Sequence, residues 1–127
     1  MKILLLTHGQ LAEGLLHSVT MLIGTLSDVD FISFSESMGI EALTEDVREY
    51  LNNNNDESIL IMTDIMGGTP FNVASMESYE NERIAVFYGI NLPLFVEAYM
   101  NKDMMTFEEL VNYLDGIKNE TIGKSNL

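Results

Sequence analysis

The sequence contains no cysteine. This absence excludes disulfides, a zinc–thiolate centre and a thiol nucleophile, and it is compatible with a reducing compartment. Basic residues are also scarce, since six Lys and Arg stand against 20 Asp and Glu and give a formal net charge of −14. A surface of this sign repels nucleic acid and anionic lipid, so we expect neither as a partner. Solubility explains most of the charge, and attraction to a basic patch on a protein partner is the alternative.

Long apolar runs are absent as well. A helix that crosses a bilayer needs roughly 20 apolar residues, and no stretch of the chain approaches that length. The apolar start, Ile3–Leu6, ends after four residues, too few for the core of a signal peptide. We therefore expect a cytoplasmic protein without an inserted segment. With 127 residues, of which 46% are hydrophobic, residues 1–127 fit a single domain.

Apolar strand-like runs alternate with helical periodicities along the chain. We expect strands over residues 2–7, 29–34, 58–63 and 83–88. Helical patterns cover residues 12–23, 40–51 and 106–117, and two more begin at Pro70 and Asn91. Thr106 and Glu109 form a capping box. The alternation predicts an α/β fold, with a doubly wound, mainly parallel sheet of four strands flanked by helices. A weak pattern over Glu120–Lys124 allows a fifth strand.

Two polar side chains follow two of the predicted strands directly. In open parallel sheets, sites lie beyond the carboxyl ends of the strands, where the strand order reverses. In the order 2-1-3-4 the first and third strands are neighbours, which places His8 beside Asp64. A carboxylate that accepts the Nδ1–H of an imidazole fixes its tautomer and leaves Nε2 free as a nucleophile. Histidine can then carry a transferred group covalently.

The turn after Asp64 contributes an anion site. Thr69 suits the N-cap of the following helix and Pro70 its first position. Gly67 and Gly68 allow the backbone to approach a ligand closely, and the N–H groups at the helix start are suited to a phosphate. The Thr69 hydroxyl adds one more donor. Each feature alone is usually structural, but together they favour a phosphoryl site.

Other functions suit the residues less well. His17 falls on the polar side of the first helix, and we expect no chemical role for it. We expect no metal, because His8 and Asp64 lack an obvious third ligand, and no cofactor. There is no P-loop, no dinucleotide-binding glycine motif and no acidic pair after the first strand of the kind that a response-regulator receiver needs. The first loop also lacks the hydroxyl-rich run of a flavodoxin.

Three stretches of the chain resemble the IIA component of the mannose-family (mannose/fructose/sorbose) sugar phosphotransferase system. They are residues 3–14, 63–75 and 89–97. The resemblance implies that His8 is phosphorylated through Nε2 and that Asp64 orients it. It implies that Gly68 and Thr69, beside Gly67, belong to the loop that contacts the phosphoryl group. The protein would then be a phosphotransferase component, a phosphohistidine carrier that needs no metal because its donor is a phosphoprotein.

The resemblance also implies partners. The donor would be the phosphocarrier protein HPr and the acceptor a IIB protein or domain, with indirect association with membrane IIC and IID components. A homodimer is implied, in which a C-terminal antiparallel strand within Glu120–Leu127 is exchanged between subunits and the apolar fourth helix fits a dimer contact. We expect a free-standing IIA protein, whose sugar this domain does not reveal.

Two related functions remain open on the sequence. One is the phosphotransfer subunit of a dihydroxyacetone kinase, whose first domain shares the fold and the histidine. The other is a regulatory IIA-like module, in which phosphorylation of the histidine is a signal. The Gly-Gly-Thr-Pro-Phe-Asn run of residues 67–72 is more similar to the sugar-transport branch.

Overall fold

A computed structural model describes all residues from Met1 to Leu127. The chain forms two compact units, Met1–Ile90 and Asn91–Leu127. The assignment of residues 1–127 to one domain stays a prediction.

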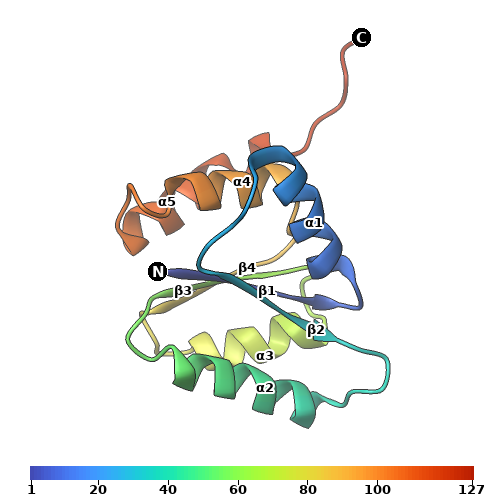
Figure 1. Cartoon of the computed structure of the whole chain (residues 1–127), viewed down its shortest axis with the longest axis vertical. Helices are drawn as coiled ribbons and strands as arrows, with labels where there is room; N and C mark the ends of the chain where they lie inside the picture. The colour runs from blue at the N-terminus through green and yellow to red at the C-terminus, as the bar shows by residue number, and fades with distance from the viewer. The chain divides into compact units, whose positions relative to one another are not determined.

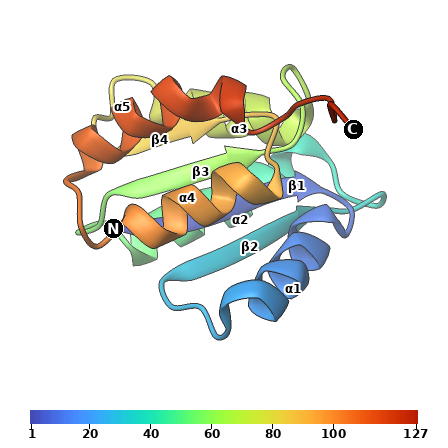
Figure 2. The ribbon, with the colours of Figure 1, turned by 90° about the horizontal axis from the view of Figure 1, so that it is seen from above.

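The first unit is built on a four-stranded sheet in which every pair of neighbouring strands is parallel (Figure 2). Its strands are β1 (Lys2–His8), β2 (Val29–Phe34), β3 (Ile59–Thr63) and β4 (Ile84–Phe87). The order is β2-β1-β3-β4. This confirms the predicted α/β fold and strand order, and it makes β1 and β3 central neighbours.

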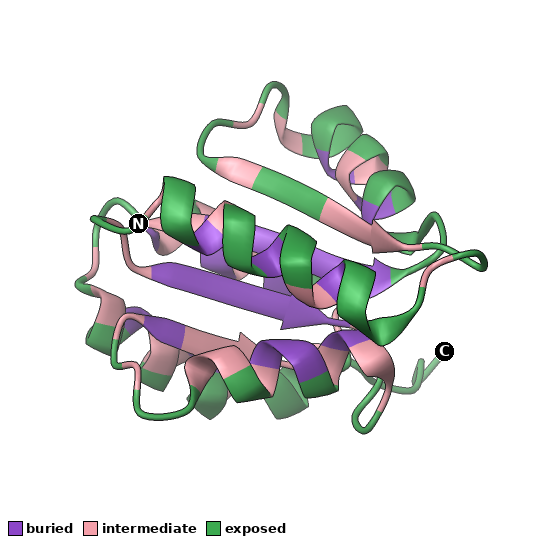
Figure 3. Ribbon diagram, turned by 90° about the horizontal axis from the view of Figure 1, so that it is seen from below, coloured by how far each residue is buried: buried purple, intermediate pink, exposed green.

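The two central strands are buried almost throughout, whereas the edge strands β2 and β4 are partly exposed (Figure 3). The sequences of β1 and β3 are uninterrupted apolar runs because both faces of a central parallel strand are covered. Leu4 and Leu6 of β1 join Ile59 and Ile61 of β3 in one hydrophobic core cluster. Alternate residues of these strands therefore face the same side of the sheet.

Helices cover both faces of this sheet. They are α1 (Leu11–Ile23), α2 (Ile40–Asn53) and α3 (Thr69–Ser78). Within this unit α2 and α3 lie side by side on one face and α1 lies on the other (Figure 1). The α2 residues Leu43, Val47 and Leu51 complete the core cluster. The helical pattern predicted over residues 12–23 is confirmed, since α1 ends at Ile23 and its C-cap Gly24 adopts φ 85°.

Arg83, just before β4, ties the end of α2 to the sheet. Its guanidinium donates to three backbone carbonyl oxygens, those of Leu51 (3.1 Å), Asn54 (3.1 Å) and Glu57 (2.9 Å). The last carbonyls of a helix have no partner within the helix and carry partial negative charge. A single cation therefore satisfies acceptors in the last turn of α2 and in the loop that follows it.

The second unit is helical. It contains α4 (Leu92–Asn101), α5 (Phe107–Ile117) and the 3₁₀ turn η1 (Lys118–Glu120). The capping box is confirmed, because the Thr106 hydroxyl accepts the Glu109 N–H at 3.2 Å and the Glu109 carboxylate accepts the Thr106 N–H at 3.0 Å. No helix of the chain combines the length and apolar character that a membrane span requires.

Within this single chain, no strand forms over Glu120–Lys124. The Thr121 hydroxyl and backbone N–H both donate to the carbonyl of Lys118, at 2.7 and 3.3 Å. These bonds curl the backbone into a turn where an extended strand was expected. Exchange of a strand between subunits stays a prediction.

Candidate functional site

The structure brings together the two residues that the strand ends predicted. His8 is the last residue of β1, and Asp64 directly follows β3. The Asp64 Oδ2 atom accepts the backbone N–H of His8 at 2.8 Å and lies 2.8 Å from Nδ1 of the same histidine. The other oxygen, Oδ1, accepts the N–H of Ile65 at 2.9 Å. One carboxylate is thus fixed by two backbone donors while it contacts the imidazole ring.

These contacts set the protonation of the pair. Burial alone would raise the pKa of Asp64, but hydrogen bonds from the His8 backbone and ring and from the Ile65 N–H outweigh it and hold the pKa below its usual value. The carboxylate is therefore ionised at neutral pH and can only accept hydrogen bonds. Because Nδ1 must then be the donor, the neutral imidazole carries its lone pair on Nε2. The His8 side chain is 45% exposed, whereas that of Asp64 is only 13% exposed.

Two further residues border the imidazole. Phe34, the last residue of β2, stands opposite His8 in the strand register, and the two ring centroids lie 5.6 Å apart at 77°. Gly68 lies so close that a Cβ atom there would be 2.9 Å from His8 Cε1. The sequence analysis missed Phe34. Its position at the end of a strand beside β1 was the signal that could have identified it.

The start of α3 differs in register from the sequence prediction. Gly68 is the N-cap residue, with φ −72° and ψ 164°, and its carbonyl accepts the N–H of Asn72 at 2.9 Å. Thr69 and Pro70 are therefore the first and second helical residues, and the prediction of Thr69 as N-cap was wrong. Glycine serves here because the N-cap lies against the His8 ring, where a Thr side chain has no room.

The turn before α3 is held by its own contacts. Gly67 adopts φ 82°, a conformation that residues with a Cβ rarely adopt. Its carbonyl accepts the Asn72 side-chain amide at 3.2 Å. The Gly68 N–H donates to the carbonyl of Ile65 at 3.2 Å, whereas the Thr69 N–H lies in the first turn of α3, where backbone donors have no helical partner. The Thr69 donor is thus suited to an anion.

The backbone after β4 anchors the Asp64 end of the site. The N–H of Gly89 donates to the Asp64 carbonyl at 2.9 Å, and the N–H of Ile90 donates to the Thr63 carbonyl at 3.1 Å. Gly89 has φ 74°. Gly89 and Ile90 are the first residues of the stretch 89–97 named in the sequence analysis. Their N–H groups therefore extend the hydrogen bonding of β3 beyond its last residue, Thr63.

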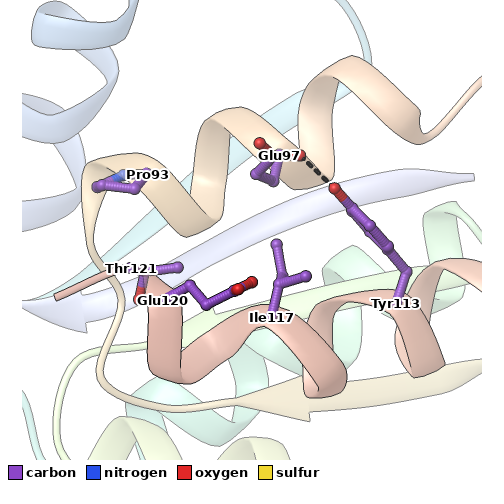
Figure 4. A pocket seen from close by; sticks show the side chains of 6 residues that line it. All are labelled: Pro93, Glu97, Tyr113, Ile117, Glu120 and Thr121. Carbon is purple, nitrogen blue, oxygen red and sulfur yellow. Dashed lines mark hydrogen bonds between the residues drawn. The ribbon is translucent and has the colours of Figure 1, made fainter.

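A separate hollow of about 150 Å³ lies in the second unit (Figure 4). It is lined by Pro93, Glu97, Tyr113, Ile117, Glu120 and Thr121. The Tyr113 hydroxyl donates to Glu97 at 2.7 Å, and this hydrogen bond raises the pKa of the phenol. Since the Glu97 carboxylate is already paired within the unit, we interpret its hydrogen bond with Tyr113 as a structural contact that joins α4 to α5.

Other predicted positions are also defined. His17 lies exposed on α1, as its place on the polar side of the helix predicted. No cluster of three His, Asp or Glu side chains that could hold a metal ion is present.

Comparison with known proteins gives a consistent result. The family model described as "PTS system fructose IIA component" matches residues 2–114. The sorbose-specific EIIA component of Lacticaseibacillus casei is 29% identical over 120 residues, which are 94% of this chain and 87% of that protein. The mannose-specific EIIAB component of Escherichia coli K12 is 36% identical over 107 residues, 83% of this chain, but the match spans only 33% of that longer protein.

Solved structures agree with the relatives. The mannose/sorbose specific IIA subunit from Enterococcus faecalis superposes with a TM-score of 0.90 at 29% identity, covering 99% of this chain and 95% of that one. Component EIIA from Streptococcus agalactiae gives a TM-score of 0.86 at 31% identity, covering 97% and 95%. The family match over most of the chain, together with this shared fold, shows that the protein belongs to the mannose family of phosphotransferase-system IIA components, which are phosphotransfer proteins.

Proposed function

We propose that this protein is a cytoplasmic carrier that accepts a phosphoryl group from phospho-HPr on Nε2 of His8 and passes it to a IIB protein or domain during sugar uptake. The contact of Asp64 Oδ2 with His8 Nδ1, at 2.8 Å, carries the proposal. It assigns the ring proton to Nδ1 and leaves Nε2, on a side chain that is 45% exposed, as the nucleophile.

The transfer moves one phosphoryl group between two protein nucleophiles. The lone pair of Nε2 forms a bond to phosphorus while the bond to the donor nitrogen of HPr breaks, and that electron pair returns to the donor. Positive charge grows on the His8 ring as the new bond forms, and the Asp64 carboxylate stabilises it across Nδ1. Transfer to the IIB nucleophile repeats these steps with His8 as the donor, so positioning and electrostatics perform the catalysis.

The turn before α3 supplies the phosphoryl-binding groups in this proposal. The N-terminus of a helix offers unpaired N–H donors and a favourable dipole to an anion. The Thr69 N–H and hydroxyl would bind phosphoryl oxygens. Gly67 gives the turn its left-handed backbone, and Gly68 leaves room for the His8 ring.

The partners follow from the same proposal. HPr is the donor, IIB the acceptor, and membrane IIC and IID components associate indirectly with a homodimer of this chain. The net charge of −14 suits a basic surface on a protein partner and disfavours nucleic acid. Genes for IIB, IIC and IID components beside this one would favour transport over a regulatory role.

The decisive experiment is phosphorylation followed by intact mass. The protein is incubated with phosphoenolpyruvate, enzyme I and HPr from its own source. We expect one acid-labile phosphoryl adduct on the wild type and on a His17→Ala control, and none on His8→Ala. A wild-type mass that never changes would overturn the proposal.

Asp64 provides the second test. Asp64→Ala should slow the transfer but keep the modified residue, because Nε2 remains while its orientation and charge stabilisation are lost. Single-turnover rates measured from phospho-HPr decide this. A rate equal to that of the wild type would show that Asp64 does not orient His8.

A further inference from the structure

Phe34 stands against the imidazole from a strand that neither Asp64 nor the α3 turn belongs to. It is the direct register partner of His8, so the two side chains leave the sheet on the same face. Their ring centroids lie 5.6 Å apart in a T-shaped arrangement at 77°. This is the geometry that aromatic pairs prefer, and it contributes beyond simple burial.

Phe34 is itself firmly held. Its side chain is partly buried and packs against the core cluster beneath α2 and α3. Its carbonyl accepts the N–H of Gly9, the residue that follows His8, at 2.9 Å. The strand pairing, the packed side chain and this hydrogen bond fix the Phe34 ring relative to the His8 backbone.

The other two contacts leave one motion of the imidazole open. Asp64 holds the ring at a single atom, Nδ1, and a hydrogen bond to one atom allows the ring to tilt about it. Gly68 lies near Cε1 but has no side chain that could hold the ring. A tilt would move Nε2, and a displacement of about 1 Å at a reacting atom can lower a rate by as much as about 100-fold.

We propose that Phe34 is a positioning residue for phosphoryl transfer, whose ring prevents this tilt and keeps Nε2 aimed outward. The inference rests on the proposed function of His8. Phe34 touches neither the phosphoryl group nor the partner in this account, and it acts through the imidazole alone.

The test uses phosphoramidate, a small donor that needs no docking surface. The His8 Nε2 attacks phosphorus, the P–N bond of phosphoramidate breaks, and ammonia leaves. Phe34→Leu and Phe34→Met keep an apolar side chain but remove the ring, and we expect the rate at the His8 peptide to fall about two- to tenfold. Phe34→Tyr restores a ring and should react like the wild type.

The matched control is Phe31→Leu. Phe31 lies on the same strand, is 42% exposed and pairs in register with Leu5, away from His8. The control should therefore keep the wild-type rate. Thermal melting of every variant identifies any that does not fold. Two ring-deleting variants are made so that the test can use one of them if the other does not fold.

A spectroscopic signature separates positioning from a merely structural role. In the unphosphorylated wild type and in Phe34→Tyr, the His8 Nδ1–H should give a ¹⁵N-coupled proton signal protected by Asp64. In the folded ring-deleting variants this signal should broaden through faster exchange with water. Unchanged signals and rates in these variants, or an equal loss in Phe31→Leu, would overturn the inference.

The two proposals fail in different ways. If phospho-HPr leaves the wild type unmodified, the proposed function fails, whereas the phosphoramidate rates and the proton signal still report on Phe34. If HPr phosphorylates the wild type but the Phe34 variants match it in both measurements, only the positioning role fails.

Discussion

Adding one methyl group at Gly68 should impair His8 without greatly destabilising the fold. The backbone at Gly68 has φ −72° and ψ 164°, which any residue adopts, so Gly68→Ala carries no left-handed strain. The added Cβ would instead lie 2.9 Å from both His8 Cε1 and Ile65 Cγ2, and 3.3 Å from the Ile65 carbonyl oxygen. Real Cβ atoms essentially never come so close, so a neighbour must move.

The size of the effect follows from which neighbour moves. The Ile65 side chain is 61% exposed and can rotate away, but the His8 ring can retreat only by disturbing its contacts with Asp64 and Phe34. Overpacking costs about 1–3 kcal/mol of unfolding free energy. Replacing Gly by Ala offsets about 0.4–1 kcal/mol of this, because the unfolded chain becomes less flexible. If the clash is relieved at His8, the overpacking cost falls on the reacting ring and lowers the transfer rate about fivefold to a hundredfold.

Gly67→Ala is the matched control, one residue away. A Cβ at Gly67 meets nothing within 4 Å, but the backbone has φ 82°. A non-glycine residue in such a conformation costs roughly 1–2 kcal/mol. Urea unfolding should therefore show losses of similar size for the two variants. Their phosphorylation rates should differ, with Gly68→Ala the slower. A normal rate in Gly68→Ala, or an equal decline in both variants, would refute the steric argument.

Three further predictions concern stability. The pKa of Asp64 is lowered in the folded state, so the ionised carboxylate stabilises the fold fully above its unfolded pKa of about 3.9. This stabilisation is lost as the pH falls through the lower folded pKa. The urea midpoints of the wild type and Asp64→Asn should therefore converge in that acidic range. Arg83→Ala leaves three carbonyl acceptors without their cation and should cost about 2 kcal/mol or more in urea, whereas a loss below about 0.5 kcal/mol would contradict this account. Thr106→Ala should cost about 1 kcal/mol of unfolding free energy and Thr106→Ser much less, and equal values would exclude the cap.

The sequence was sufficient to predict the sheet because its central strands are uninterrupted apolar runs. The parallel order then placed His8 beside Asp64, and the structure confirms this juxtaposition. The start of α3 was predicted one residue late, because preferences for Thr at the N-cap and Pro after it ignore the neighbouring strand. The Cε1 atom of His8, 60 residues away in sequence, leaves no room for a side chain at Gly68, and local propensity contains no such information.

The Asp64 carboxylate beside the His8 ring is itself positioned by the His8 backbone. Asp64 Oδ2 binds both the backbone N–H and the ring of His8, while the Asp64 carbonyl is held by the N–H of Gly89. A small slide of β3 along β1 would therefore strain the backbone contact together with the ring contact. Because two fixed strands define the site, the imidazole orientation should withstand changes in the surface loops and respond mainly to the groups beside the ring, which are Asp64, Phe34 and Gly68. Phosphoryl transfer should accordingly be more sensitive to changes at the residues beside the His8 ring than to the overall stability of the fold.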